Sequence, residues 1–270
     1  MLNRIHNYDS TPYTRQSPQH SSTHDRFKAQ FQQQGYLQYK SLELDIVSKL
    51  VLIDEFRHLE KAPHFGGAEQ RYIRSSAALI LPWEPELQPV WLPDEAPLDH
   101  RVNFKETTSQ QYAALSAQVK QTIYLNQLIV DDFQLTFGLQ QNQLPVRVGV
   151  HFMKLSTENP QRLAINSPDY FYQDQELFTF AHLVYRSNNL AGGVHYIATA
   201  QEKQKRLDEV DRQKILQQFT LQHPADSFAI YDPTVVHYVT PIQQMEQSLN
   251  KDAGEYWMIV IDFSPTQTKA

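Results

Sequence analysis

The sequence has no cysteine, no long apolar run and no excess of basic residues. Without cysteine, the chain forms no disulfide and has no thiolate metal site or cysteine nucleophile. No apolar run approaches the roughly 18 residues of a membrane span, and the first residues lack the apolar core of a secretory signal. We therefore expect a cytoplasmic protein without a membrane partner.

The charge balance excludes a further class of function. The 270 residues have a formal net charge of −6, and the sequence pI is about 6.0. The composition therefore gives no indication of a basic surface that binds nucleic acid. No Ser-His-Asp or nucleotide-binding pattern emerges, and the Gly66-Gly67 pair is typical of a turn. With 41% hydrophobic and 11% aromatic residues, the chain can fill a large core.

The N-terminal half has mainly helical patterns. Residues 1–24 are polar and predict a mobile arm. Helical patterns follow at 25–37, 41–61 and 108–139, while the proline-rich segment 62–104 favours short strands and loops. In the second helical pattern the apolar positions recur at helical intervals: Leu42, Ile46, Leu50, Ile53 and Phe56. Ser41 is a plausible start for this helix, which we expect to pack against a sheet.

Strand patterns dominate the second half, beginning at Val146. The expected strands are 146–155, 162–166, 177–185, 194–199, 227–231, 234–239 and 256–263. Between the fourth and fifth of these lies the charged segment 201–223, which we interpret as a helical insert with a solvated face.

A polar cluster, Tyr172-Gln173-Asp174, precedes the aromatic strand pattern at 177–185. In an extended chain Tyr172 and Asp174 project to the same face. His237 lies in another strand pattern far downstream. An X-x-Asp motif followed by a distant His presents three ligands to one metal in a double-stranded β-helix, and with His at X it is the facial triad of non-haem Fe(II) enzymes. We predict that Asp174 and His237 bind metal and that Tyr172 is a catalytic residue.

These motifs resemble those of the bacterial Fe(II) and 2-oxoglutarate dioxygenases that include the L-isoleucine hydroxylase. The matching segments are Ser167–Asp174, Tyr185-Arg186, Gly192-Gly193 and His237-Tyr238-Val239-Thr240-Pro241. The resemblance implies an α+β protein with a double-stranded β-helix, of the jelly-roll or cupin-like type, and N-terminal helices packed on one side. It also implies Fe(II), 2-oxoglutarate and a small-molecule substrate such as a free amino acid.

The chain departs from this family at two positions. Tyr172 stands where the family has its first metal-binding His. Tyr256 stands near the position where the family has the arginine that anchors 2-oxoglutarate. Ligation by a phenolate at pH 7 costs about 4 kcal/mol before the metal lowers the phenol pKa. An imidazole from a neighbouring strand is an alternative third ligand, and the candidates are His151, His182 and His195.

A buried dicarboxylate needs a cationic partner, and the strand around Tyr256 has no basic residue. Arg147, Lys154 or Arg186 on adjacent strands can supply this charge, and the forked geometry of arginine favours Arg147 and Arg186. We therefore predict Arg186, Arg147 and Tyr256 as the residues that bind the co-substrate.

We expect residues 25–270 to form a single domain, with helical support mainly in 25–144 and the barrel core mainly in 145–265.

Three functions remain open. The first is an iron oxygenase similar to amino-acid hydroxylases, acting on a small polar substrate. The second is a binding protein or pseudoenzyme without metal and 2-oxoglutarate. The third is a metal enzyme with an altered triad, using Tyr172 or another His, that does not use 2-oxoglutarate. The sequence leaves the oligomeric state open.

Overall fold

The computed structural model describes residues 18–62, 70–94, 112–174, 176–246 and 252–266. Most of the predicted arm, and parts of the segments 62–104 and 108–139, lie outside these residues. The first helix begins at Pro18, inside the segment predicted as an arm. None of the helices in these described ranges has both the length and the apolar character needed to cross a bilayer.

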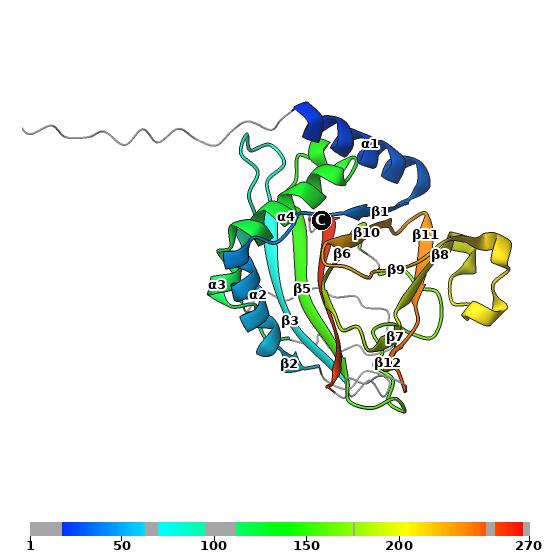
Figure 1. Cartoon of the computed structure of the whole chain (residues 1–270). Coiled ribbons are helices and arrows are strands. Elements are labelled where there is room, and N and C mark those ends of the chain that lie inside the picture. The colour runs from blue at the N-terminus through cyan, green and yellow to red at the C-terminus, as the bar shows by residue number, and fades with distance from the viewer. Residues whose placement is uncertain (1–17, 63–69, 95–111, 175, 247–251, 267–270) are drawn as a thin grey trace, which may run out of the picture.

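A larger antiparallel sheet forms the centre of the molecule (Figure 1). Its strand order in the described residues is β1 (Tyr36–Lys40), β10 (Asp226–Tyr231), β6 (Phe178–Arg186), β13 (Gly254–Pro265), β5 (Val146–Thr157), β3 (Arg71–Ile80) and β2 (Glu60–Lys61), with β4 (Val90–Trp91) also paired to β3. The N-terminal half therefore supplies strands to the sheet as well as helices.

Two smaller sheets face the larger one. They are β11 (Val235–Val239), β8 (Val194–Thr199) and β9 (Ile215–Thr220), and β12 (Ile242–Gln244) with β7 (Leu190–Gly192). Single bridges from Tyr172 to His237 and from Ala164 to Ile242 attach the segment after β5 to these sheets. The two faces enclose an apolar cluster that includes Met153, Leu183 and Phe219. This arrangement is a double-stranded β-helix, which confirms the predicted fold.

Strand β13 shows why both faces of the larger sheet are covered. Trp257, Ile259 and Ile261 point into the core shared with the helices, while Tyr256 and Met258 point into the space between the sheets. A strand buried on both faces is apolar throughout rather than alternating. Its sequence therefore predicts the strand but not which face encloses the site.

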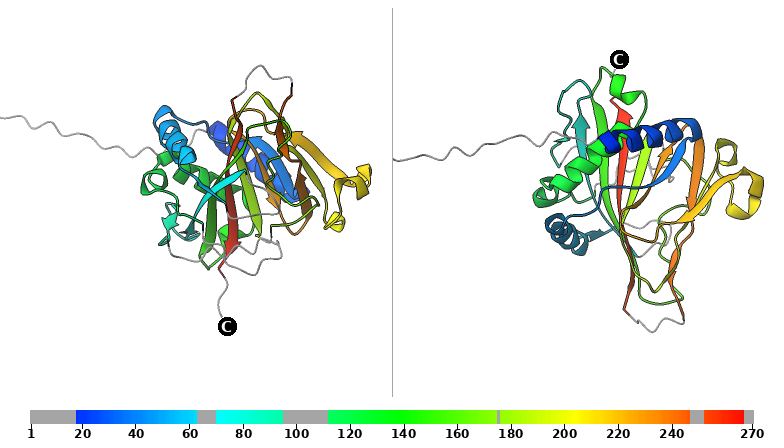
Figure 2. Two further views of the ribbon diagram at one scale, coloured as in Figure 1. Left: turned by 90° about the horizontal axis from the view of Figure 1, so that it is seen from below. Right: turned by 45° about the horizontal axis from the view of Figure 1, so that its top comes forward.

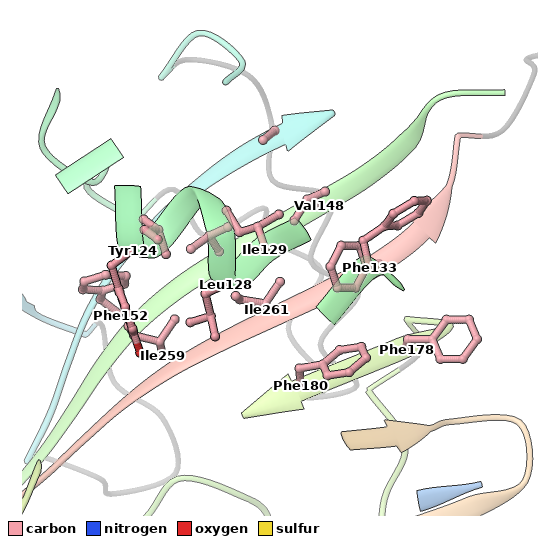
Figure 3. Close-up of a cluster of buried hydrophobic side chains, with 14 of the residues drawn as sticks. Tyr124, Leu128, Ile129, Phe133, Val148, Phe152, Phe178, Phe180, Ile259 and Ile261 are labelled. Atoms are coloured by element: carbon pink, nitrogen blue, oxygen red, sulfur yellow. The ribbon is translucent and has the colours of Figure 1, made fainter. Parts of the chain in front are cut away.

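The helices lie on the outer face of the larger sheet, opposite the smaller sheets (Figures 1 and 2). They are α1 (Pro18–Gln34), α2 (Ile46–Arg57), α3 (Ala117–Lys120) and α4 (Ile123–Leu135). Figure 3 shows Leu128, Ile129 and Phe133 of α4 packed over Ile259 and Ile261 of β13. Burying side chains of this size stabilises the fold by about 1.5–3 kcal/mol each.

Two helix predictions need correction. Helix α2 begins at Ile46 rather than Ser41, because the Asp45 carboxylate accepts a hydrogen bond from the Ser48 backbone N–H at 2.9 Å and caps it. Its predicted apolar face is partly wrong, since Ile46 is 80% exposed and Leu50 is 65% exposed. The long pattern at 108–139 is divided into α3 and α4, each with its own N-cap, Ser116 and Thr122.

The predicted helical insert at 201–223 is also wrong. The segment contains the short 3₁₀ turns η2 (Ala200–Glu202), η3 (Leu207–Glu209) and η4 (Arg212–Lys214), followed by strand β9. A further turn, η1 (Leu139–Gln141), precedes β5. In β9, Ile215, Gln217 and Phe219 alternate with more exposed residues, which is the period of a strand. Pairing with β8 overrides the helical preference of the charged residues before it.

A buried polar network joins α4 to the sheet. One carboxylate oxygen of Asp132 accepts a hydrogen bond from the Tyr39 hydroxyl at 2.8 Å, and the other lies 2.8 Å from Nε2 of His182. Nδ1 of His182 lies 2.9 Å from the Ser227 hydroxyl. His182 is therefore bonded on the helix side of the sheet and is not a candidate for a ligand inside the barrel.

We predict that Asp132→Ala lowers the free energy of unfolding by about 3 kcal/mol, because it leaves His182 and Tyr39 buried without their partner. Urea denaturation followed by circular dichroism measures this. Gln127→Ala, on the exposed face of the same helix, should change the value by no more than about 0.5 kcal/mol. Equal effects of the two substitutions would contradict the prediction.

Candidate functional site

The candidate site is built on one backbone pair. Tyr172 N–H donates to the His237 carbonyl at 3.0 Å, and His237 N–H donates back to the Tyr172 carbonyl at 3.0 Å. Residues directly opposite in an antiparallel pair share a face, and the two rings lie 4.1 Å apart between centroids. Two positions along, Asp174 lies on the same side, with its Oδ2 3.6 Å from Nε2 of His237. The structure thus brings together Tyr172, Asp174 and His237.

Asp232 joins this group, although the sequence analysis does not single it out. It lies in the turn between β10 and β11 and is 3% exposed. Within the described part of the chain, Asp174, Asp232 and His237 form a group whose possible ligand atoms all lie within 4.8 Å of one another. A signal was present in the sequence, since Asp232 directly follows one strand pattern and precedes His237 by five positions, but aspartate is common in turns.

Burial sets the protonation of the two aromatic members. It lowers the pKa of His237, against the opposing effect of Asp174, so the imidazole is neutral and able to bind metal. Its Nδ1 is buried and finds no hydrogen-bond partner among the described residues. Burial, reinforced by the Asp174 charge, raises the pKa of Tyr172 well above its ordinary value. Tyr172 is therefore a neutral phenol.

Neither of the other two candidate imidazoles joins the group of ligand atoms. His151 faces the same cavity, where its Nδ1 lies 2.7 Å from the Ser75 hydroxyl and its Nε2 lies 2.8 Å from Oδ2 of Asp262. The His195 ring stacks on Phe219, with centroids 5.2 Å apart, and its Nε2 lies 3.4 Å from the Tyr256 hydroxyl.

These side chains line a cavity of about 150 Å³ between the larger sheet and the smaller sheets. Its polar lining includes both signs of charge. The polar residues are Arg71, Tyr112, His151, Asn166, Tyr172, Asp174, Glu176, Thr179, His195, His237 and Asp262. Burial, followed by the nearby charge of Asp262, raises the pKa of Glu176 to about 7. The cavity can thus hold a small polar molecule beside the candidate metal ligands.

Arg186 and Tyr256 lie opposite one another on β6 and β13. The guanidinium carbon of Arg186 is 5.4 Å from the centroid of the Tyr256 ring, within range of a cation–π contact. Nη2 of Arg186 donates to the carbonyls of Leu190 at 3.3 Å and Gly192 at 3.0 Å. Nη1 is buried, and among the described residues it has no hydrogen-bond partner.

The second predicted arginine, Arg147, lies near the other end of β5. It pairs with Ser264 of β13 and Leu79 of β3, whereas Tyr256 pairs with Leu155. A rise of about 3.4 Å per residue separates the two pairs along the strand by about 27 Å. Arg147 influences Glu176 electrostatically, but it is not among the described residues that line the cavity.

A double-stranded β-helix that holds an imidazole and a carboxylate together in its cavity is typical of non-haem iron oxygenases. Residues 54–253 match the family model described as 2OG-Fe dioxygenase, and the chain belongs to this family. Membership implies Fe(II) as the metal and 2-oxoglutarate as the co-substrate, with small molecules as substrates.

Solved structures with the same fold share little sequence with this chain. The crystal structure of IDO from Bacillus thuringiensis is 17% identical, with a TM-score of 0.70, and the match covers 90% of this chain and all of that one. A bsmA homolog from Methylobium petroleophilum PM1 is 15% identical, with a TM-score of 0.67 over 92% of this chain and 96% of that one. The Fe(II)/α-ketoglutarate-dependent dioxygenase TqaL is 11% identical, with a TM-score of 0.65 over 94% and 92%. A comparison with curated proteins finds no match.

The residues present fit these two groups. The neutral imidazole of His237 has a buried nitrogen without a hydrogen-bond partner among the described residues, and carboxylate oxygens lie beside it. Imidazole and carboxylate are ligands that suit iron. The buried Nη1 of Arg186 is a donor suited to a carboxylate of 2-oxoglutarate.

The environment of His195 leads to a pH-dependent prediction. Burial lowers the pKa of His195 to about 3, whereas an unfolded histidine titrates near 6.5. Between these values the unfolded state binds the proton and the folded state does not, so stability is lost as the pH falls below about 6.5. From pH 7 to pH 5 this single group lowers the free energy of unfolding by about 2 kcal/mol.

We predict that His195→Phe, which keeps an aromatic ring against Phe219, removes this part of the acid sensitivity. Urea unfolding of both proteins in EDTA, at pH 7 and pH 5, gives the two differences in free energy. The drop should be about 2 kcal/mol smaller in the variant. The other histidines contribute equally to both proteins. Identical decreases in the free energy of unfolding would therefore show that His195 binds a proton as readily in the folded state as in the unfolded state.

Proposed function

We propose that this protein is an Fe(II)- and 2-oxoglutarate-dependent oxygenase that hydroxylates a small polar substrate such as a free amino acid. The observation that carries the proposal is the convergence of Asp174 and His237, 63 positions apart in the sequence, at 3.6 Å inside one cavity. In this proposal both side chains bind the metal. When bound, the iron and 2-oxoglutarate supply the oxygen chemistry.

Arg186 holds 2-oxoglutarate in this proposal. The family's anchoring arginine belongs near Tyr256 on β13, and Arg186 reaches the same place from the adjacent strand. Tyr256 then supports the guanidinium through its ring, and the carbonyls of Leu190 and Gly192 fix its orientation. The unused Nη1 is the donor for the carboxylate.

The cavity's charges support an amino acid as substrate. Arg71 lines the cavity and offers a cation to a carboxylate, while Glu176 and Asp262 offer anions to an ammonium group. The resemblance of the motifs to those of the isoleucine hydroxylase group supports the same class. Tyr172, a neutral phenol beside His237, acts as a hydrogen-bond donor that orients the reacting molecules.

One observation favours a second candidate function. Tyr172 replaces the family's first metal-binding His, which is what a binding protein on the same fold, without metal, would show. A site with a phenolate ligand is less well supported, because burial and the Asp174 charge hold the Tyr172 phenol in its neutral form.

We predict that protein purified without oxygen, and then supplied with Fe(II) and O2, converts 2-oxoglutarate to succinate and CO2 in the presence of a suitable amino acid. Succinate and hydroxylated product should form in equal amounts, as measured by mass spectrometry across a panel of free amino acids. Asp174→Ala and His237→Ala should each lower the rate by about 10²-fold or more, since each removes a metal ligand. A protein that binds neither iron nor 2-oxoglutarate would support the binding-protein alternative.

Arg186→Met should weaken 2-oxoglutarate binding, because it removes the cation and keeps the length of the side chain. Loss of one partner of a buried charge pair costs about 2–4 kcal/mol, which corresponds to a KM for 2-oxoglutarate about 30- to 1000-fold higher. Arg186→Lys should give an intermediate value, since lysine lacks the forked geometry.

Arg147→Met tests the competing assignment. If Arg147 is the anchor, Arg147→Met raises the KM for 2-oxoglutarate and Arg186→Met does not. Melting temperatures should be recorded for all variants, because Arg186 also donates to backbone carbonyls.

A further inference from the structure

The candidate metal site lacks one of the donors expected from the family pattern. Two of the expected positions are occupied by Asp174 and His237, and the third is occupied by Tyr172. The phenol must lose a proton to become a strong ligand, whereas a carboxylate is an anionic oxygen donor at neutral pH. A site that retains its metal therefore needs a donor from elsewhere in the chain.

Asp232 lies where this donor is needed. Its carboxylate belongs to the group, with Asp174 and His237, whose possible ligand atoms lie within 4.8 Å of one another. Ligand atoms around one metal ion are separated by up to about twice the metal–ligand distance, or about 4.2 Å for bonds near 2.1 Å. A small contraction of the group therefore brings all three side chains to one ion.

The backbone holds Asp232 against the segment that contains Asp174. Gln173, between Tyr172 and Asp174, donates from its side chain to the Asp232 carbonyl and, at 3.2 Å, to the Val235 carbonyl. The Asp232 N–H donates to the Leu177 carbonyl at 3.3 Å. These contacts fix the turn between β10 and β11 on the segment that follows Tyr172, so the position of Asp232 is built into the fold.

The charges at this place also call for a cation. Asp174 and Asp232 bring two carboxylates close to one neutral imidazole, and Asp232 is almost fully buried. Like charges at such distances repel one another. A divalent ion between the two carboxylates removes the repulsion, and His237 adds a nitrogen donor whose Nδ1 has no hydrogen-bond partner among the described residues.

We propose that Asp232 is the third protein ligand of the metal, in place of the imidazole that the family has at the position of Tyr172. The inference rests on the proposed function, because it concerns the same metal. It makes the site one imidazole with two carboxylates instead of two imidazoles with one carboxylate. The extra anionic oxygen raises the site's preference for hard divalent ions such as Mn(II).

Binding of Mn(II) to the metal-stripped, full-length chain tests this assignment without depending on turnover. Electron paramagnetic resonance of free Mn(II) and calorimetry give the stoichiometry and Kd. The wild type should bind one Mn(II). Asp232→Asn should raise the Kd at least about 30-fold, within the 10- to 100-fold range typical of perturbed metal sites. Tyr172→Phe should change it less than about threefold.

Two further variants separate ligand loss from indirect effects. Asp169→Asn removes one negative charge from an exposed position near the site and should leave the Kd unchanged. The double variant Tyr172→His with Asp232→Asn recreates the family's donor set and should regain Mn(II) binding to within about tenfold of the wild type. This rescue decides the question even if Asp232→Asn is less stable.

The outcomes distinguish this inference from the proposed function. A wild-type chain that binds neither Mn(II) nor Fe(II) overturns both. One Mn(II) per chain with an unchanged Kd in Asp232→Asn overturns the inference alone. Loss of binding in Tyr172→Phe but not in Asp232→Asn assigns the third donor to the phenol. Failure of the double variant to regain Mn(II) also overturns the role of Asp232.

Discussion

The reciprocal pair of backbone hydrogen bonds between Tyr172 and His237 is the contact on which the site depends. It joins the segment after β5 to β11 and so connects two parts of the chain that are far apart in sequence. Because paired residues share a face, this contact turns Tyr172, Asp174 and His237 toward the same cavity. A shift of one residue in this pairing would point either Asp174 or His237 away from the cavity.

The rest of the fold keeps this pairing in place. Strand β13 lies between β5 and β6, and its two faces separate the helix-side core from the barrel interior. Helix α4 fixes the outer face through its apolar side chains and through Asp132, which bonds His182 on β6. The chemistry on the inner face thus has a rigid sheet behind it. That residues 25–270 form a single domain stays a prediction.

Sequence reasoning reaches the fold and part of the site. The period-2 patterns place most of the barrel strands, and the spacing of Asp174 and His237 predicts their convergence. The pattern fails at β9, where pairing with β8 decides the structure, and at α2, where Asp45 sets the start. Asp232 is missed because a turn aspartate carries no periodicity, and only the folded chain shows which buried groups surround it.

The sequence does not show that Arg147 and Arg186 lie near different ends of β13, for a related reason. Both are arginines on strands that flank β13, and their residue types give equal support to either. What separates them is the register of β13, which places Tyr256 opposite Arg186 and Ser264 opposite Arg147. Register is a property of pairing between distant segments, so it emerges only with the sheet.

The two departures from the family pattern are each matched by a neighbour. Beside Tyr172, where an imidazole is missing, lies the buried carboxylate of Asp232; beside Tyr256, where an arginine is missing, lies the guanidinium of Arg186. A buried anion near another anion, and a buried cation with an unused donor, both destabilise a fold that binds nothing. A barrel that had lost its metal and co-substrate would gain stability by replacing such groups with apolar residues. The presence of both neighbours in one chain favours an oxygenase whose ligands have moved to adjacent strands over a binding protein that has lost them.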